Sequence, residues 1–205
     1  MLSVPALITL ICGVLAGCTG ASQPGTNQAA PPAPSHVQAS GAHHAGPLGS
    51  AGNPLVLTCA AEAFTGTPGT GPPVPSRPRP EDLAIGPVYI VNGKVLATAN
   101  PASYGDHGSY KIPLVVRTGS TVTVTIAPAA RGHVVIDNPA AQNRGLGGVT
   151  AITYHSCPHA QGFFAQGFAF THRPYRGCVP LDVTIGNRPP VRHVTLSLFA
   201  RPCRQ

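Results

Sequence analysis

The sequence predicts an all-β protein whose folded part is an antiparallel β-sandwich, immunoglobulin-like or jelly-roll-like, with eight or nine strands. Apolar and polar residues alternate with period two in several short segments, as in strands with one buried face. Turn residues separate these segments, and no window shows a helical period with caps. Only 9% of the residues are charged, while Gly and Pro each number 24, which suits strands and loops better than helices. A Greek-key barrel is the alternative architecture.

The first 18 residues contain an apolar segment, Val4 to Leu15, that has the length of a signal peptide and is too short for a membrane span. It ends in Leu15-Ala16-Gly17-Cys18. These four residues resemble the lipobox of bacterial lipoproteins, in which the Cys becomes the N-terminus and carries the lipid. The resemblance implies lipidation of Cys18 and an extracytoplasmic protein anchored to the cell membrane by its lipid. A plain cleaved secretory peptide is the alternative.

A linker and a single domain are predicted to follow. Residues 19–54 are mostly Gly, Ala, Ser, Pro, Gln and Asn. This composition is typical of a disordered tether, because such a segment can bury too little apolar surface to offset the entropy lost on ordering. The domain is expected at 55–205, and it begins with a short strand at 55–59. A second run rich in Pro and Gly at 65–80 is predicted to be a surface loop, because Pro donates no hydrogen bond to a sheet.

The body of the domain shows the period-two pattern most clearly. The predicted strands cover residues 88–91, 95–97, 110–117, 121–126, 181–185 and 193–198. Asn92-Gly93 indicates a type I′ hairpin turn, and 118–120 has the length of a hairpin loop. The apolar stretch 148–186 is expected to hold three strands in all. Three of its phenylalanines have even residue numbers, which places them on one face of an extended chain, and they are expected in the core: Phe164, Phe168 and Phe170. Phe163 falls on the other face.

Four cysteines remain after Cys18, and an even number in an exported protein indicates two disulfides. Three pairings are possible. We expect Cys157–Cys178, which closes a short loop, and Cys59–Cys203, which joins the first strand to the last.

The segment from Tyr154 to His159 contains a candidate metal site, because in an extended chain His155, Cys157 and His159 point the same way. The segment resembles the copper-ligand loop of plastocyanin-like cupredoxins, which follows a Tyr-bearing strand with Cys and then Pro-His. Only Pro158 separates Cys from His here, and the Met ligand of that family is absent. A copper-binding lipoprotein that uses His155, His159 and His172 is therefore the alternative. The expected structure is a disulfide-anchored turn with exposed histidines and no cofactor.

The formal net charge is +7, and six arginines lie after His172. A basic surface favours polyanions. The residues predicted to contact anionic wall polymers or lipid headgroups are Arg173, Arg176, Arg188 and Arg192. Nucleic acid is not an expected partner, because the cationic residues are scattered and the N-terminus directs export.

Catalytic motifs are lacking: there is no Gly-x-Ser-x-Gly, no His-Glu-x-x-His and no phosphate-binding glycine loop. Asp and Glu together number six. His133 and Asp137 have the spacing to share one face of a strand, but no nucleophile accompanies them. We therefore expect a non-enzymatic binding or structural module of the cell envelope. A cell-wall hydrolase whose active site the sequence does not reveal is a further alternative.

The body also resembles uncharacterised secreted or lipid-anchored proteins of actinobacteria, over roughly residues 80–205. The shared features are Asp82-Leu83, the Gly119–Ile126 strand, Gly167-Phe168 and the closing Gly177–Leu181 segment. This resemblance implies a sandwich fold and an extracytoplasmic location, and it implies no activity.

Overall fold

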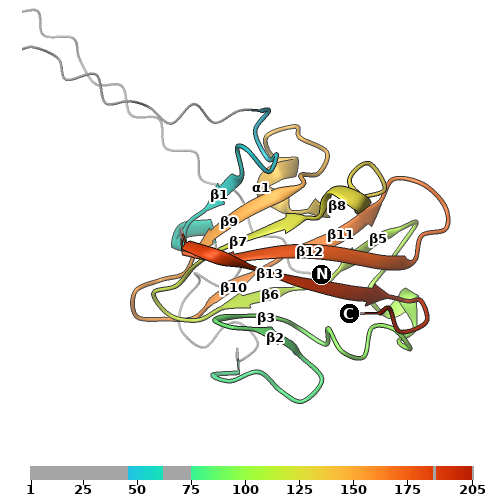
Figure 1. Ribbon diagram of the computed structural model, residues 1–205, viewed down its shortest axis with the longest axis horizontal. Coiled ribbons are helices and arrows are strands. Elements are labelled where there is room, and N and C mark those ends of the chain that lie inside the picture. The colour runs from blue at the N-terminus through green and yellow to red at the C-terminus, as the bar shows by residue number, and fades with distance from the viewer. Residues whose placement is uncertain (1–45, 62–74, 187, 205) are drawn as a thin grey trace, which may run out of the picture. The chain divides into compact units, whose positions relative to one another are not determined.

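The computed structural model describes residues 46–61, 75–186 and 188–204. The predicted signal peptide with Cys18, the linker up to residue 45 and the loop residues 65–74 lie outside this part. The described chain is all-β, as predicted, and its largely antiparallel sheets are consistent with a sandwich (Figure 1). No helix among the described residues has the length and apolar character needed to cross a membrane.

A five-stranded sheet carries most of the long-range pairing. Its order is β1 (Leu55–Leu57), β9 (Ala151–His155), β7 (Thr121–Ile126), β12 (Gly177–Ile185) and β13 (Arg188–Leu198). All neighbours are antiparallel except β1 and β9, which are parallel. The Thr/Val alternation of β7 explains which of its side chains are buried. Val122, Val124 and Ile126 are buried, while the Thr123 hydroxyl bonds the Thr153 hydroxyl across the strands at 2.8 Å.

Two four-stranded sheets complete the fold. The first contains β10 (Gly162–Phe164), β6 (Leu114–Val116), β3 (Val88–Ile90) and β2 (Leu83–Ile85), and the second contains β4 (Gly105–Asp106), β5 (Ser109–Lys111), β11 (Gly167–Phe170) and β8 (Val134–Asp137). The helical elements of the described chain are a one-turn helix, α1 (Pro139–Gln142), and three 3₁₀ turns, η1 (Cys59–Ala61), η2 (Pro101–Ser103) and η3 (Pro128–Ala130).

The described chain has thirteen strands, more than the eight or nine predicted. The sequence did not predict β2, β4 and β8, and the predicted strand 110–117 is divided into two. It breaks at Pro113 into β5 and β6, which belong to different sheets. Ile112 N donates to Gln166 O, and Pro113 contributes only its carbonyl, which accepts from Val91 N. A proline cannot extend the ladder with an N–H of its own, so the strand turns from one sheet to the next there.

Two predicted hairpins are wrong. Asn92-Gly93 lies in a turn, with Asn92 at φ 58°, but 95–97 form further turns instead of a strand. The hairpin here is β2–β3, and it turns at Gly86, whose φ of +66° suits a residue without a Cβ. The loop 118–120 joins β6 to β7, which lie in different sheets and do not pair.

The three sheets enclose one hydrophobic core. Phe164 and Phe168 are fully buried, as predicted, and Phe170 is half-buried against the core. Phe163 is half-exposed on the opposite face of its strand. The largest of the fully buried side chains is Tyr154, whose hydroxyl donates to Gln166 Oε1, and burial raises the pKa of this phenol.

Both predicted disulfides are wrong: the bonds are Cys59–Cys157 and Cys178–Cys203. The sheet order explains why Cys59 cannot reach Cys203. These residues follow β1 and β13, which are the two edges of the five-stranded sheet, about 19 Å apart at roughly 4.8 Å per strand. A disulfide needs Cα atoms within about 7 Å.

Cys157 and Cys178 are separated for a different reason. β9 and β12 both pair antiparallel with β7, so they run in the same direction. Cys157 follows the end of β9 and Cys178 lies at the start of β12, and they are therefore at opposite ends of the sheet. Cys59 instead leaves β1 at the end where its parallel neighbour β9 also ends, and the Cα atoms of Cys59 and Cys157 are 4.8 Å apart.

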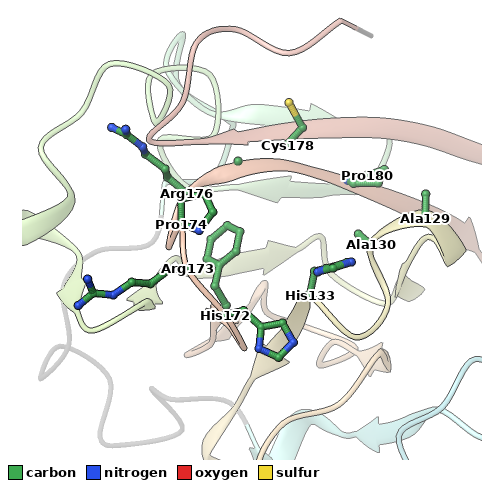
Figure 2. Close-up of a pocket in the computed structure, with 11 residues that line it drawn as sticks. Ala129, Ala130, His133, His172, Arg173, Pro174, Arg176, Cys178 and Pro180 are labelled. Atoms are coloured by element: carbon green, nitrogen blue, oxygen red, sulfur yellow. The ribbon is translucent and has the colours of Figure 1, made fainter.

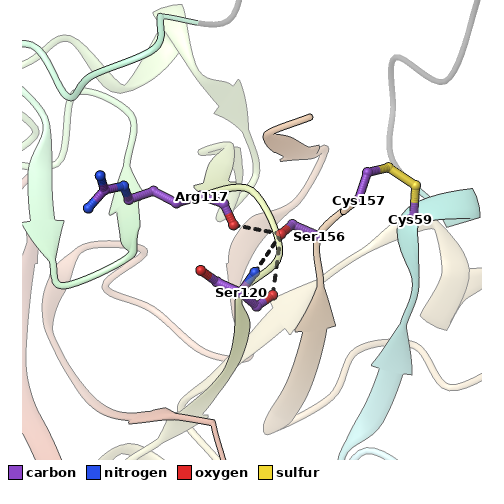
Figure 3. The surroundings of a disulfide bond; sticks show 5 residues. All are labelled: Cys59, Arg117, Ser120, Ser156 and Cys157. Carbon is purple, nitrogen blue, oxygen red and sulfur yellow. Dashed lines mark hydrogen bonds between the residues drawn. A yellow bond between two sulfur atoms is a disulfide. The ribbon is translucent and has the colours of Figure 1, made fainter. Parts of the chain in front are cut away.

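The turn beside the Cys59–Cys157 bond is held by the buried Ser156 (Figure 3). Its hydroxyl donates to Arg117 O at 2.6 Å and accepts from Ser120 N at 3.0 Å. Gly119 N donates to Cys157 O. The disulfide therefore attaches β1 to a part of the fold that is already fixed by hydrogen bonds.

The described residues extend N-terminal to residue 55, into the predicted linker 19–54. Residues 46–54 form turns that lie against the sheet. The carbonyl of Gly49 accepts from both Thr150 N and Ala151 N, and Gly49 is buried against Val149. Backbone hydrogen bonds, which composition does not reveal, attach this segment to the domain.

Candidate functional site

A pocket of about 420 Å³ lies where β11 passes into β12. Its polar lining comes from two histidines and two arginines, and we call it the basic pocket: His133, His172, Arg173 and Arg176. The rest of the lining is apolar or small, from η3, Phe170 and the start of β12, and it includes no Asp or Glu.

Two loops bring the histidines of the basic pocket together. His133 follows η3 and precedes β8, and His172 follows β11, the strand that pairs with β8. The loops are joined by Thr171, whose N–H donates to His133 O at 2.9 Å and whose hydroxyl donates to Gly132 O at 2.6 Å. As a result the two imidazole centroids lie 6.1 Å apart, with the rings at 86° to each other.

The side chains of Arg173 and Arg176 point away from the imidazoles of His133 and His172 (Figure 2). The Arg173 guanidinium lies 5.7 Å from the centre of the Tyr175 ring, and the carbonyl of Tyr175 accepts from the Tyr110 hydroxyl at 2.7 Å. Tyr175 therefore links the loop to β5. Within the described residues neither guanidinium has a carboxylate within ion-pair distance. Two exposed, unneutralised arginines create a positive potential that attracts anions.

The four arginines predicted to contact an anionic partner do not form one site. Arg173 and Arg176 lie in the loop just before β12, whereas Arg188 and Arg192 pair with Ile185 and Val183 at the far end of this strand. Arg192 lies beside Gly86. That glycine lines a second pocket, of about 490 Å³, which holds Arg77 and Arg117. The sequence did not predict His133, Arg77 or Arg117 as residues of an anion site, because their positions beside the other basic residues depend on sheet pairing.

The three predicted metal ligands, His155, His159 and His172, do not form one group. His155 ends β9 beside Thr121, and its Nδ1 lies 2.9 Å from the Thr121 hydroxyl. His172 lies near η3, beyond the other end of β7. The part of the chain that the structure describes contains no group of three or more His, Cys, Asp or Glu side chains placed to hold a metal ion. Cys157 is bonded to Cys59, so it offers no thiolate, and the cupredoxin-like ligand set is contradicted.

His133 and Asp137, the pair that the sequence placed on one strand face, lie at the two ends of β8 and line different pockets. They do not act together. Searches against protein-family models, curated proteins and solved structures found no match to this chain.

Proposed function

We propose that this protein is an extracytoplasmic lipoprotein, anchored through Cys18, whose β-domain binds phosphate-bearing groups of the cell envelope at the basic pocket without catalysing a reaction. The anchor rests on the lipobox resemblance alone. One structural observation supports the binding role: Arg173 and Arg176 share a pocket with two imidazoles and with no acidic side chain.

Phosphodiesters fit this pocket for electrostatic reasons. Guanidinium groups offer several N–H donors in a fixed geometry that matches phosphate oxygens, and hydrogen bonds between charged partners are the stronger ones. The imidazole N–H groups of His133 and His172 are donors in the same pocket, on the side away from the two guanidinium groups (Figure 2). Lipid headgroups and wall polymers carry the same phosphodiester group, so the pocket chemistry is common to both sources.

The test is calorimetric titration of the full-length protein in neutral detergent. One arm uses short-chain phosphatidylglycerol as the headgroup source, and the other uses oligo(glycerol phosphate) as the polymer source. We expect binding that weakens as salt rises, because the Debye length falls from about 10 Å at 0.1 M to about 3 Å at 1 M. Arg173→Gln with Arg176→Gln removes two cations, each worth about 1 kcal/mol near an anionic partner, and we expect roughly 30-fold weaker binding.

The matched control removes the same charge elsewhere, with Lys94→Gln and Arg144→Gln, two exposed residues that do not line the basic pocket. Equal losses in both double variants would show a general charge effect and reject the pocket. Absence of binding in both arms at low salt would reject the proposed function.

A further inference from the structure

A pocket of about 450 Å³ lies on the sheet of β5, β11 and β8, separate from the basic pocket. Its charged groups are Lys111 and Asp137, and we call it the dipolar pocket. Pro113, Pro139 and Ala165 supply apolar walls, and Ser109 and Gln142 supply polar side chains. The volume is at the small end of the range for ligand sites.

The strand register sets the distance between the two charges. Lys111 and Asp137 both pair with Gly167, one on each side of it. Directly paired residues have side chains on the same face of a sheet, so Lys111 and Asp137 flank a residue without a side chain. Their Cα atoms are about 10 Å apart at roughly 4.8 Å per strand. A Cβ at Gly167 would lie 1.9 Å from Tyr110 O, so only glycine fits in the floor.

Asp137 is held in a fixed orientation by neutral donors. Its Oδ2 accepts from the Ser109 hydroxyl at 2.9 Å, and its Oδ1 accepts from Gln142 Nε2 at 2.6 Å. These donors come from β5 and from α1, so two elements fix the carboxylate. Within the described chain neither Asp137 nor Lys111 has an ion-pair partner, and the two do not pair with each other. A half-buried carboxylate and an ammonium group therefore face one pocket without neutralisation.

We propose that the dipolar pocket binds a small zwitterion, a free α-amino acid or a free dipeptide. Its ammonium group is held by Asp137 and its carboxylate by Lys111, over the bare backbone at Gly167. The prolines contact a small apolar side chain. Each ligand charge then meets a protein charge of opposite sign that has no ion-pair partner among the described residues of the free protein. This inference is independent of the basic pocket.

The test is nuclear magnetic resonance of the isotope-labelled full-length protein, titrated with L-alanine, D-alanine and L-alanyl-L-alanine. We expect saturable shifts of the Ser109 and Gly167 amide signals for at least one of these ligands. Ethylamine and propionate each carry only one of the charges, and we expect each to bind at least tenfold more weakly. Asp137→Asn removes the negative charge but keeps an oxygen that accepts from Ser109. Lys111→Gln, made as a separate variant, removes the positive charge. Each change should weaken binding at least tenfold.

Asp106→Asn and Lys94→Gln are the controls, since both residues are exposed and outside the dipolar pocket. They should leave the affinity unchanged. Absence of saturable shifts with all three zwitterions overturns the proposal. Binding that survives both Asp137→Asn and Lys111→Gln also overturns it, provided the melting temperatures of these variants match the unsubstituted protein. Loss of the basic pocket arginines should leave this binding intact.

Discussion

Asp82 shows how one side chain organises a loop. It is 1% exposed, and its carboxylate accepts hydrogen bonds from two backbone N–H groups, those of Arg79 and Asn92, each at 2.8 Å. The Arg79 guanidinium adds an ion pair at 3.2 Å. Burial acts to raise the pKa of this carboxyl, but the hydrogen bonds and the positive charge of Arg79 outweigh it, and the pKa falls below its ordinary value. Asp82 therefore ties the segment before β2 to the turn after β3.

Asp82→Asn should destabilise the protein by about 2 kcal/mol at neutral pH, because it removes hydrogen bonds to a charged acceptor. The sign of the pH dependence follows from the lowered pKa. The stabilisation by the carboxylate is complete above the unfolded pKa of about 4 and is lost as pH falls toward the lower folded pKa. Urea unfolding between pH 7 and pH 3 should show a shallower acid loss for Asp82→Asn than for the unsubstituted protein.

Asp106→Asn is the control for Asp82→Asn, because the Asp106 side chain is 86% exposed. A surface change of this kind alters stability by less than about 0.5 kcal/mol. An acid loss of equal steepness in the unsubstituted protein and in Asp82→Asn would contradict the role given to the carboxylate.

Several strands are held in place by hydrogen bonds and disulfides to residues that are distant in the sequence. β1 has only three residues, yet it is held at the sheet edge by β9 and by a disulfide that spans 98 residues. β12 and β13 form a long hairpin, and the C-terminal tail folds back so that Cys203 N donates to the Ser197 hydroxyl. Ser197 pairs with Cys178 in register, which explains how Cys203 reaches Cys178.

The two disulfides should therefore differ in their contribution to stability. The chain-entropy estimate gives about 4.7 kcal/mol for the bond of separation 98 and about 3.5 kcal/mol for the bond of separation 25. Replacing Cys59 and Cys157 together by Ser should lower the free energy of unfolding more than replacing Cys178 and Cys203. Urea denaturation of the two double variants measures this difference. A larger loss from the Cys178–Cys203 pair, or an unreduced peptide that links Cys59 to Cys203, would contradict the fold.

At the scale of the whole molecule, the proposed location depends on Cys18, which lies outside the described residues. Cys18→Ser should abolish incorporation of a labelled fatty acid when the protein is made in a bacterial host, and it should release the protein from the washed membrane fraction. Several acyl chains anchor firmly because each buried methylene contributes about 0.8 kcal/mol. Cys12→Ser changes a cysteine inside the apolar segment and should leave the label in place. Equal labelling of Cys18→Ser and the unsubstituted protein would reject the anchor.

The sequence by itself determined the all-β class and the inward face of the strands. Val122, Val124 and Ile126 alternate with threonines, and the structure buries all three. The same local pattern identified Phe164 and Phe168 as core residues, because the side chains of a strand alternate between two faces whatever its neighbours are.

Only the tertiary structure decided which strands are neighbours. The neighbours in turn decide which cysteines form disulfides and which side chains share a pocket. β9 and β12 are parallel because both pair with β7, and this places Cys157 and Cys178 at opposite ends of the sheet. The pairing of β8 with β11 brings His133 beside His172. The period-two pattern specifies on which face of a strand a side chain lies. It does not specify which strand is the neighbour, because every strand offers the same backbone N–H and C=O groups for pairing.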